Sequence, residues 1–181
     1  MVIAGVLSLT AFACLSISCN SKKTEIRKEL GEFTKATVTI PDNMDCIDGL
    51  NVKEYKDTTK KAKLVIYYDT LSCQNCSISH LSQMEPLFER SRKSGAFDVL
   101  IIFSPRPEEC ANVTTEIATL EFDFPVFVDT YGEFRNNNKC IPTDDRFHSF
   151  LLDKEGHPIF VGNPLNSKQL ETLFTNIVNK L

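Results

Sequence analysis

Two cysteines, Cys73 and Cys76, lie between an apolar run and an amphipathic segment. The run 63–68 is almost entirely apolar, which indicates a β-strand covered on both faces. The segment 76–92 carries apolar residues at helical spacing, and Pro86 should kink that helix or begin a second one. A strand that leads directly into a helix predicts a layered α/β fold with both thiols at the junction.

The rest of the chain continues to alternate between strands and helices. Further strands are expected at 36–40, 97–103, 124–128, 150–152 and 158–161, and further helices at 108–120 and after Ser167. Strands separated by helices imply parallel crossovers, whereas the hairpin around Gly156 adds antiparallel strands. We therefore predict a mixed central sheet flanked by helices, with the strand at 36–40 as an N-terminal extension.

Residues 1–19 contain no charged side chain and are rich in small residues. The stretch Ser16-Ile17-Ser18-Cys19 resembles a bacterial lipoprotein signal, in which the chain is cut before the cysteine and lipid is attached to its sulfur. The weaker alternatives are a cut before Cys14, an uncleaved anchor and a soluble secreted form. The predicted organisation is a signal peptide at 1–19, a polar tether at 20–35 and one domain at 36–181, held by lipid on the periplasmic side of the bacterial cell envelope.

The charge balance argues against nucleic acid as a partner. The chain has 20 Lys and Arg against 24 Asp and Glu, a net charge of -4, and no broad basic field. Seven cysteines in 181 residues are too few for a disulfide-dense miniature scaffold. The cysteines are therefore expected to have separate roles.

The position of Cys73 and Cys76 predicts redox chemistry. A thiolate at a helix N-terminus faces free N–H groups and the positive end of the helix dipole, which lowers the pKa of the first cysteine. Two intervening residues, Gln74 and Asn75, keep the second sulfur within bonding reach of the first. The second thiol is then able to attack a mixed disulfide and release the partner.

Four segments share motifs with one protein superfamily. They are the strand before Cys73-Gln74-Asn75-Cys76, the helical segment 84–87, the strand 124–129 and the strand-turn 150–156. Through these segments, residues 36–181 resemble the thioredoxin superfamily, most closely its TlpA-like and AhpC/TSA-type envelope redoxins. The resemblance implies a thioredoxin-like fold and disulfide exchange, with Cys73 as nucleophile and Cys76 as resolving thiol. It also implies protein dithiols and disulfides of the envelope as partners, and no cofactor beyond the redox-active disulfide.

The sequence departs from that family at three places. Ser72 stands where the family usually has Trp, and Tyr67 stands where many members carry a buried acid. The family's cis-proline place falls on His148, unless a bulge separates Pro142 from its strand; we favour His148. An imidazole there would stabilise the Cys73 thiolate or act as a general base, so we include His148 in the catalytic set.

Two other function classes stay open. Cys73, Cys76 and His148, with or without His80, would make a zinc or copper site, which is not the favoured interpretation. A redox-silent binding module is the second alternative. A peroxidatic site is a minor one, because the proline that peroxiredoxins need upstream of Thr70 is absent.

Three further cysteines have no role assigned by the sequence. They are Cys46, Cys110 and Cys140. A Cys110–Cys140 disulfide is an open alternative, and partly buried inert thiols are the favoured interpretation.

Overall fold

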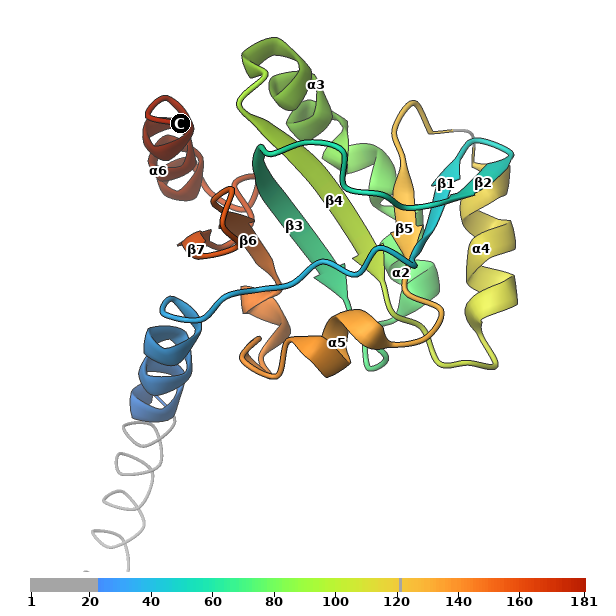
Figure 1. The fold of residues 1–181 in the computed structure, drawn as a ribbon, viewed down its shortest axis with the longest axis horizontal. Helices are drawn as coiled ribbons and strands as arrows, with labels where there is room; N and C mark the ends of the chain where they lie inside the picture. The colour runs from blue at the N-terminus through green and yellow to red at the C-terminus, as the bar shows by residue number, and fades with distance from the viewer. Residues whose placement is uncertain (1–22, 121) are drawn as a thin grey trace, which may run out of the picture.

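The computed structural model describes residues 23–120 and 122–181, and these form a seven-stranded mixed sheet with helices packed on it (Figure 1). The strand order is β2-β1-β5-β4-β3-β6-β7. The strands are β1 Asp45–Asp48, β2 Asn51–Glu54, β3 Ala62–Tyr68, β4 Phe97–Phe103, β5 Val126–Val128, β6 Ser149–Leu152 and β7 Pro158–Val161. β3, β4 and β5 are parallel, and the other neighbouring pairs are antiparallel.

The helices connect the parallel strands and close the chain. They are α2 Gln74–Ser79, η1 Leu81–Met84, α3 Glu85–Ser94, α4 Cys110–Thr119, α5 Glu133–Asn137, η2 Asp145–Phe147 and α6 Lys168–Val178. The segment 76–92, expected to be helical with either a kink or a second helix at Pro86, is divided near His80, and Pro86 lies in the first turn of α3. Pro86 therefore begins a second helix, which was one of the two predicted outcomes.

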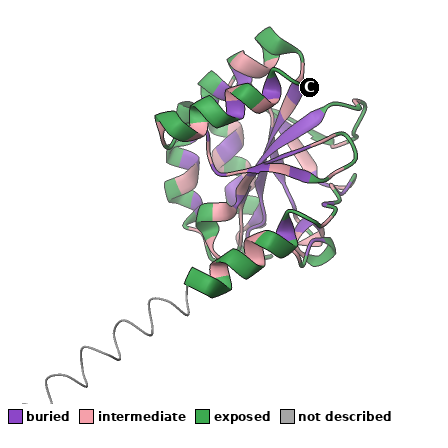
Figure 2. Cartoon of the chain, turned by 90° about the vertical axis from the view of Figure 1, so that its left-hand side faces the viewer, coloured by how far each residue is buried: buried purple, intermediate pink, exposed green. Residues whose placement is uncertain are grey.

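The two central strands are buried on both faces because their side chains alternate between two apolar layers. Leu64 and Ile66 of β3 face one layer, where Ile78 of α2 and Phe174 of α6 are also fully buried. Figure 2 shows the buried strands between helices whose outer surfaces are exposed. This confirms the predicted sheet flanked by helices and fixes the end of β3 beside α2.

The second apolar layer is covered mainly by the N-terminal chain and α5. Val65 and Tyr67 of β3 face this layer, with Phe33, Phe134 and Phe150. The rings of Phe33 and Phe150 meet edge to face at 5.0 Å between centroids. Residues 23–33, within the expected tether, are helical, and the chain after them crosses the sheet face toward the viewer in Figure 1.

The prediction of a strand at 36–40 is wrong. These residues run along the second layer without joining the sheet, because their backbone bonds to other partners. Val38 N donates to Gly156 O at 2.8 Å, and the Asn138 side chain both accepts from Thr39 N and donates to Thr39 O. The alternation of buried and exposed residues is real, but it reflects packing on the layer rather than strand pairing.

The N-terminal extension of the sheet is instead the β1–β2 hairpin. β1 pairs antiparallel with β5, with Cys46 opposite Phe127, and β2 is the edge strand. The hairpin sequence is largely polar and β2 is fully exposed, so hydrophobic periodicity does not reveal it. The short helix α5 was also not predicted.

None of the helices in residues 23–120 and 122–181 combines the length and the apolar character that a membrane span requires.

Candidate active site

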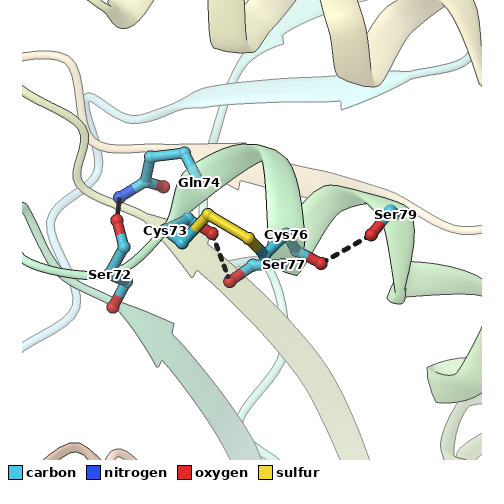
Figure 3. The surroundings of a disulfide bond; sticks show 6 residues. All are labelled: Ser72, Cys73, Gln74, Cys76, Ser77 and Ser79. Carbon is cyan, nitrogen blue, oxygen red and sulfur yellow. Dashed lines mark hydrogen bonds between the residues drawn. A yellow bond between two sulfur atoms is a disulfide. The ribbon is translucent and has the colours of Figure 1, made fainter.

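Cys73 and Cys76 form a disulfide at the carboxyl end of β3, where the chain turns into α2 (Figure 3). Their Cα atoms are 5.3 Å apart, within the usual range for a disulfide. Both residues are exposed at the surface. The predicted pairing and its strand-to-helix position are therefore present in the structure.

The turn before the disulfide is organised by the Asp69 carboxylate. Its Oδ1 accepts hydrogen bonds from Leu71 N at 2.9 Å, from Ser72 N at 3.1 Å and from Ser72 Oγ at 3.2 Å. This is the local side-chain-to-backbone bonding that aspartate supplies in turns. It sets the direction in which the chain enters α2.

Gln74 secures the same turn from within the cysteine motif. Its Nε2 donates to Asp69 O at 2.7 Å and more weakly to Ser72 O at 3.4 Å. Only 7% of the residue is exposed, although it lies between two exposed cysteines. Its Oε1 is buried and has no hydrogen-bond partner among the described residues.

Cys73 is the N-cap residue of α2, and no described side chain caps the first turn. The carbonyl of Cys73 accepts from Ser77 N at 3.0 Å and from Ser77 Oγ at 3.1 Å, while Ser79 Oγ donates to Cys76 O at 2.7 Å. The first N–H groups of the helix therefore remain available beside Cys73. Such groups stabilise a thiolate more than a thiol.

Two clefts open beside the disulfide. The β6-side cleft has a volume of about 480 Å³ and is lined by both cysteines, with Tyr68, His80, Arg146 and His148 among the other residues. The α4-side cleft has a volume of about 410 Å³ and is lined by Cys73, Gln74, Arg106, Glu109 and Glu116, among others. Cys73 therefore belongs to the walls of both clefts, whereas Cys76 lines the β6-side cleft.

His148 lies directly before β6, the place that the sequence resemblance assigns to a cis-proline. Its carbonyl accepts from Tyr67 N at 2.9 Å, and no cis peptide bond occurs in the described chain. The imidazole is 3% exposed, and its Nε2 donates to Pro142 O at 2.9 Å because a carbonyl only accepts. Its Nδ1 is buried and has no described hydrogen-bond partner. The side chain thus ties the 142–148 loop to β6 and lines the cleft that holds both sulfurs.

Tyr67 stands where the sequence resemblance places a buried acid. Its ring packs against His148 at 5.2 Å and against Phe134 at 4.9 Å between centroids. Burial raises the pKa of Tyr67 to about 12, so the phenol stays neutral at physiological pH. This position therefore carries no negative charge beneath the disulfide.

The alternative metal-ligand set of Cys73, Cys76 and His148 is not assembled in this disulfide-bonded state. Across residues 23–120 and 122–181, no three His, Cys, Asp or Glu side chains lie together as a metal site would require. His80 is exposed, and its Nδ1 accepts from Gln83 Nε2 at 3.0 Å. Cys73 and Cys76 are bonded to each other, so neither sulfur is a thiolate, and His148 bonds to Pro142 O through Nε2 while its Nδ1 has no partner among the described residues.

Cys46, Cys110 and Cys140 are free thiols, so the alternative Cys110–Cys140 disulfide is not formed. The Cys110 thiol donates to Arg106 O at 3.4 Å. Burial raises the pKa of all three thiols, which makes each a weaker nucleophile at neutral pH. The expected signal and lipidation residues Cys14 and Cys19 lie outside the described residues.

Sequence reasoning missed three features of the site. These are the Asp69 turn, the buried Gln74 amide and the α4-side cleft. Asp69 followed by Ser72 was a usable signal, because aspartate bonds to backbone groups two and three residues later in turns. The burial of Gln74 and the contribution of α4 had no local signal, since both depend on how α2 and α4 pack.

Comparisons with known proteins support the fold. No protein-family model matches the sequence, and the curated proteins searched contain no match. Among solved structures, the chain is similar to one described as thiol:disulfide interchange protein DsbE from Chlorobium tepidum, at 14% identity, 78% coverage of this chain, 96% of that chain and a TM-score of 0.51.

Two further solved structures are similar. One is the thioredoxin domain of a thiol-disulfide oxidoreductase from Bacteroides vulgatus, at 14% identity, 79% and 98% coverage and a TM-score of 0.50. The other is an exposed lipoprotein thioredoxin from Streptococcus pneumoniae, at 18% identity, 76% and 99% coverage and a TM-score of 0.50. At identities this low, structural similarity shows the fold alone. The chain therefore has the thioredoxin-like α/β fold that its sequence motifs implied.

Proposed function

We propose that this protein is a thiol–disulfide oxidoreductase that acts on protein dithiols and disulfides. The observation that carries the proposal is the exposed Cys73–Cys76 disulfide at the N-terminus of α2. A structural disulfide is usually buried or closes a long loop, whereas this bond is accessible and joins residues only three positions apart. The names of the similar structures agree with this chemistry.

The exchange needs only the two thiols and a partner. In the reduced protein, the Cys73 thiolate attacks a partner disulfide, and one partner sulfur leaves as a thiolate. Cys76 then attacks the Cys73 sulfur, and the second partner sulfur leaves. The partner is reduced to a dithiol, and the Cys73–Cys76 pair is oxidised to the disulfide that the structure contains. The reverse sequence oxidises a partner dithiol.

His148 is proposed to assist by position. Its bond to Pro142 O holds the wall of the β6-side cleft against β3, next to both sulfurs. This arrangement supports a role in fixing the loop 142–148 beside the disulfide. His148 is proposed to belong to the catalytic set with Cys73 and Cys76, because it lines the same cleft as both cysteines.

The proposed location is the outer side of a bacterial membrane, with lipid on Cys19. The support is the Ser16-Ile17-Ser18-Cys19 motif and the polar chain that follows it. One protein of similar fold is itself described as an exposed lipoprotein. Metabolic labelling with a lipid precursor tests this directly, since Cys19→Ser should lose the label while Cys14→Ser retains it.

A redox titration and a disulfide-reduction assay test the oxidoreductase proposal. The wild-type pair should titrate reversibly, and the reduced protein should reduce a disulfide-linked protein such as insulin. Cys73→Ser should abolish the reduction, whereas Cys110→Ser, which removes a buried free thiol, should retain it. Equal activity of wild type and Cys73→Ser would leave a redox-silent binding module as the better proposal.

A further inference from the structure

The α4-side cleft differs from the β6-side cleft in how it meets the disulfide. Its walls come from the site loop, through Ser72, Cys73 and Gln74, and from the region of α4. Cys76 lines the β6-side cleft beside Cys73, but it is not part of the α4-side wall. The α4-side cleft therefore approaches the disulfide from its Cys73 end.

This geometry matters because exchange at sulfur is an in-line displacement. The attacking sulfur, the attacked sulfur and the leaving sulfur lie close to one line. A thiolate that attacks Cys73 and displaces Cys76 must therefore arrive from the side of Cys73 opposite Cys76. In the view of Figure 3, Ser72 and Gln74 lie on that side of Cys73, and both line the α4-side cleft.

Gln74 adds an independent sign that the cleft receives a ligand. It is 7% exposed, it lines this cleft, and its buried Oε1 has no hydrogen-bond partner in the described part of the chain. An unpartnered buried acceptor is costly, so its presence at a site wall calls for an explanation. A donor group of a bound partner would supply the missing bond.

The charge of the cleft indicates what kind of partner fits. Arg106 Nη2 lies 2.8 Å from Glu109 Oε1, so its charge is already matched. The Glu116 carboxylate lines the same cleft, and no ion pair with it is found among the described residues. The charged residues of the wall are thus one cation and two anions, which favours a cationic partner.

We propose that the α4-side cleft is the approach side for a protein dithiol whose attacking cysteine is flanked by lysine or arginine. This rests on the proposed function. The partner thiolate attacks the Cys73 sulfur, the Cys73–Cys76 bond breaks, and Cys76 leaves as a thiolate. The partner's second thiolate then attacks the partner's first sulfur, which is bonded to Cys73, and the Cys73 thiolate leaves. The partner ends as a disulfide, and Cys73 and Cys76 end as a dithiol.

The test compares two synthetic dithiol peptides that share a Cys-x-x-Cys core and differ only in flanking lysines or glutamates. Their rates of reducing the oxidised protein are divided by their rates with the uncharged bis(2-hydroxyethyl) disulfide, which removes differences in intrinsic thiol reactivity. The lysine peptide should be faster by about fivefold at low salt, and about 0.5 M salt should remove most of this advantage.

Matched charge variants locate the preference on the protein. Glu116→Lys should abolish or reverse the lysine advantage, and Glu116→Gln should reduce it. Glu25→Lys makes the same charge change on the exposed surface of the 23–33 helical segment and should leave the advantage unchanged.

The outcomes separate this inference from the function on which it rests. An unchanged preference in Glu116→Lys, or its loss in Asp145→Lys on the β6-side cleft, would overturn the proposed approach side while disulfide exchange still stands. Failure of both peptides to reduce the Cys73–Cys76 pair would overturn the oxidoreductase proposal itself.

Discussion

The Gln74 side-chain amide donates a hydrogen bond to the main-chain carbonyl of Asp69 across 2.7 Å. The bond joins a residue inside the cysteine motif to the turn that precedes it, while the Asp69 carboxylate organises the same turn. The loop that carries Cys73 is therefore held from both of its ends. Two polar side chains therefore set the turn by which Cys73 enters α2, while Ile78 packs the helix on the sheet.

Gln74→Ala should lower the free energy of unfolding of the oxidised protein by about 1–2 kcal/mol, because it removes a partly buried hydrogen bond to the Asp69 carbonyl. Urea unfolding of the oxidised form measures this change. The redox potential of the pair should shift as well, since the Cys73 loop loses one of its ties.

Asn75→Ala is the matched control for that experiment. Asn75 is exposed in the same motif, so its loss should change stability by less than about 0.5 kcal/mol. Equal destabilisation by the two variants would show that the Gln74 bond does not hold the loop.

His148→Ala should destabilise the protein by about 1–3 kcal/mol. The change removes a buried imidazole and leaves the Pro142 carbonyl without its 2.9 Å donor. Amide hydrogen exchange should show faster opening of the segment 142–148. His80→Ala, at an exposed histidine, is the control, and protection of 142–148 that stays unchanged in His148→Ala would contradict the positioning role.

Asp129 should make the protein less stable as pH rises through the acid range. Asp129 is 2% exposed, and burial raises the pKa of its carboxyl above the ordinary value, although Ser104 and two backbone N–H groups donate to it. The folded state therefore holds this proton more tightly than the unfolded state does. The resulting loss of stability begins near the ordinary aspartate pKa of about 4 and is complete above the raised folded pKa.

The variant Asp129→Asn isolates this contribution. It should be less stable overall, because an amide nitrogen replaces one oxygen that accepts hydrogen bonds. The decrease in the free energy of unfolding that Asp129 causes as pH rises should be absent. Urea unfolding of both proteins from pH 3 to pH 7 measures the difference between their slopes. Parallel curves for the two proteins would refute the assignment.

The five described thiols should react at different rates after reduction. Cys73 and Cys76 are exposed, whereas Cys46, Cys110 and Cys140 are buried or half-buried and burial raises their pKa. Iodoacetamide at neutral pH should label the first two at least about tenfold faster, as mass spectrometry of the peptides would show. Labelling of Cys46 at the rate of Cys73 would indicate that a third thiol is reactive.

Local pattern predicted the central strands well. The run 97–103, apolar except for the half-buried Asp98, matches β4 residue for residue, because a strand buried on both faces needs a nearly continuous apolar sequence. Ser167 caps α6 as predicted, with its side chain accepting from Leu170 N. The same reasoning failed at 36–40, where alternation came from packing while the backbone bonded to Asn138 and Gly156.

The sequence alone determined the α/β alternation, the strand-to-helix position of Cys73 and Cys76, and the class of chemistry expected there. These depend on side-chain periodicity and on spacing within a few residues. Only the tertiary structure decided which segment of the chain extends the sheet, which group the His148 imidazole bonds to and which residues form the α4-side cleft. Those features join residues far apart in the chain, such as Gln74 and Glu116, and their contacts depend on how whole elements pack.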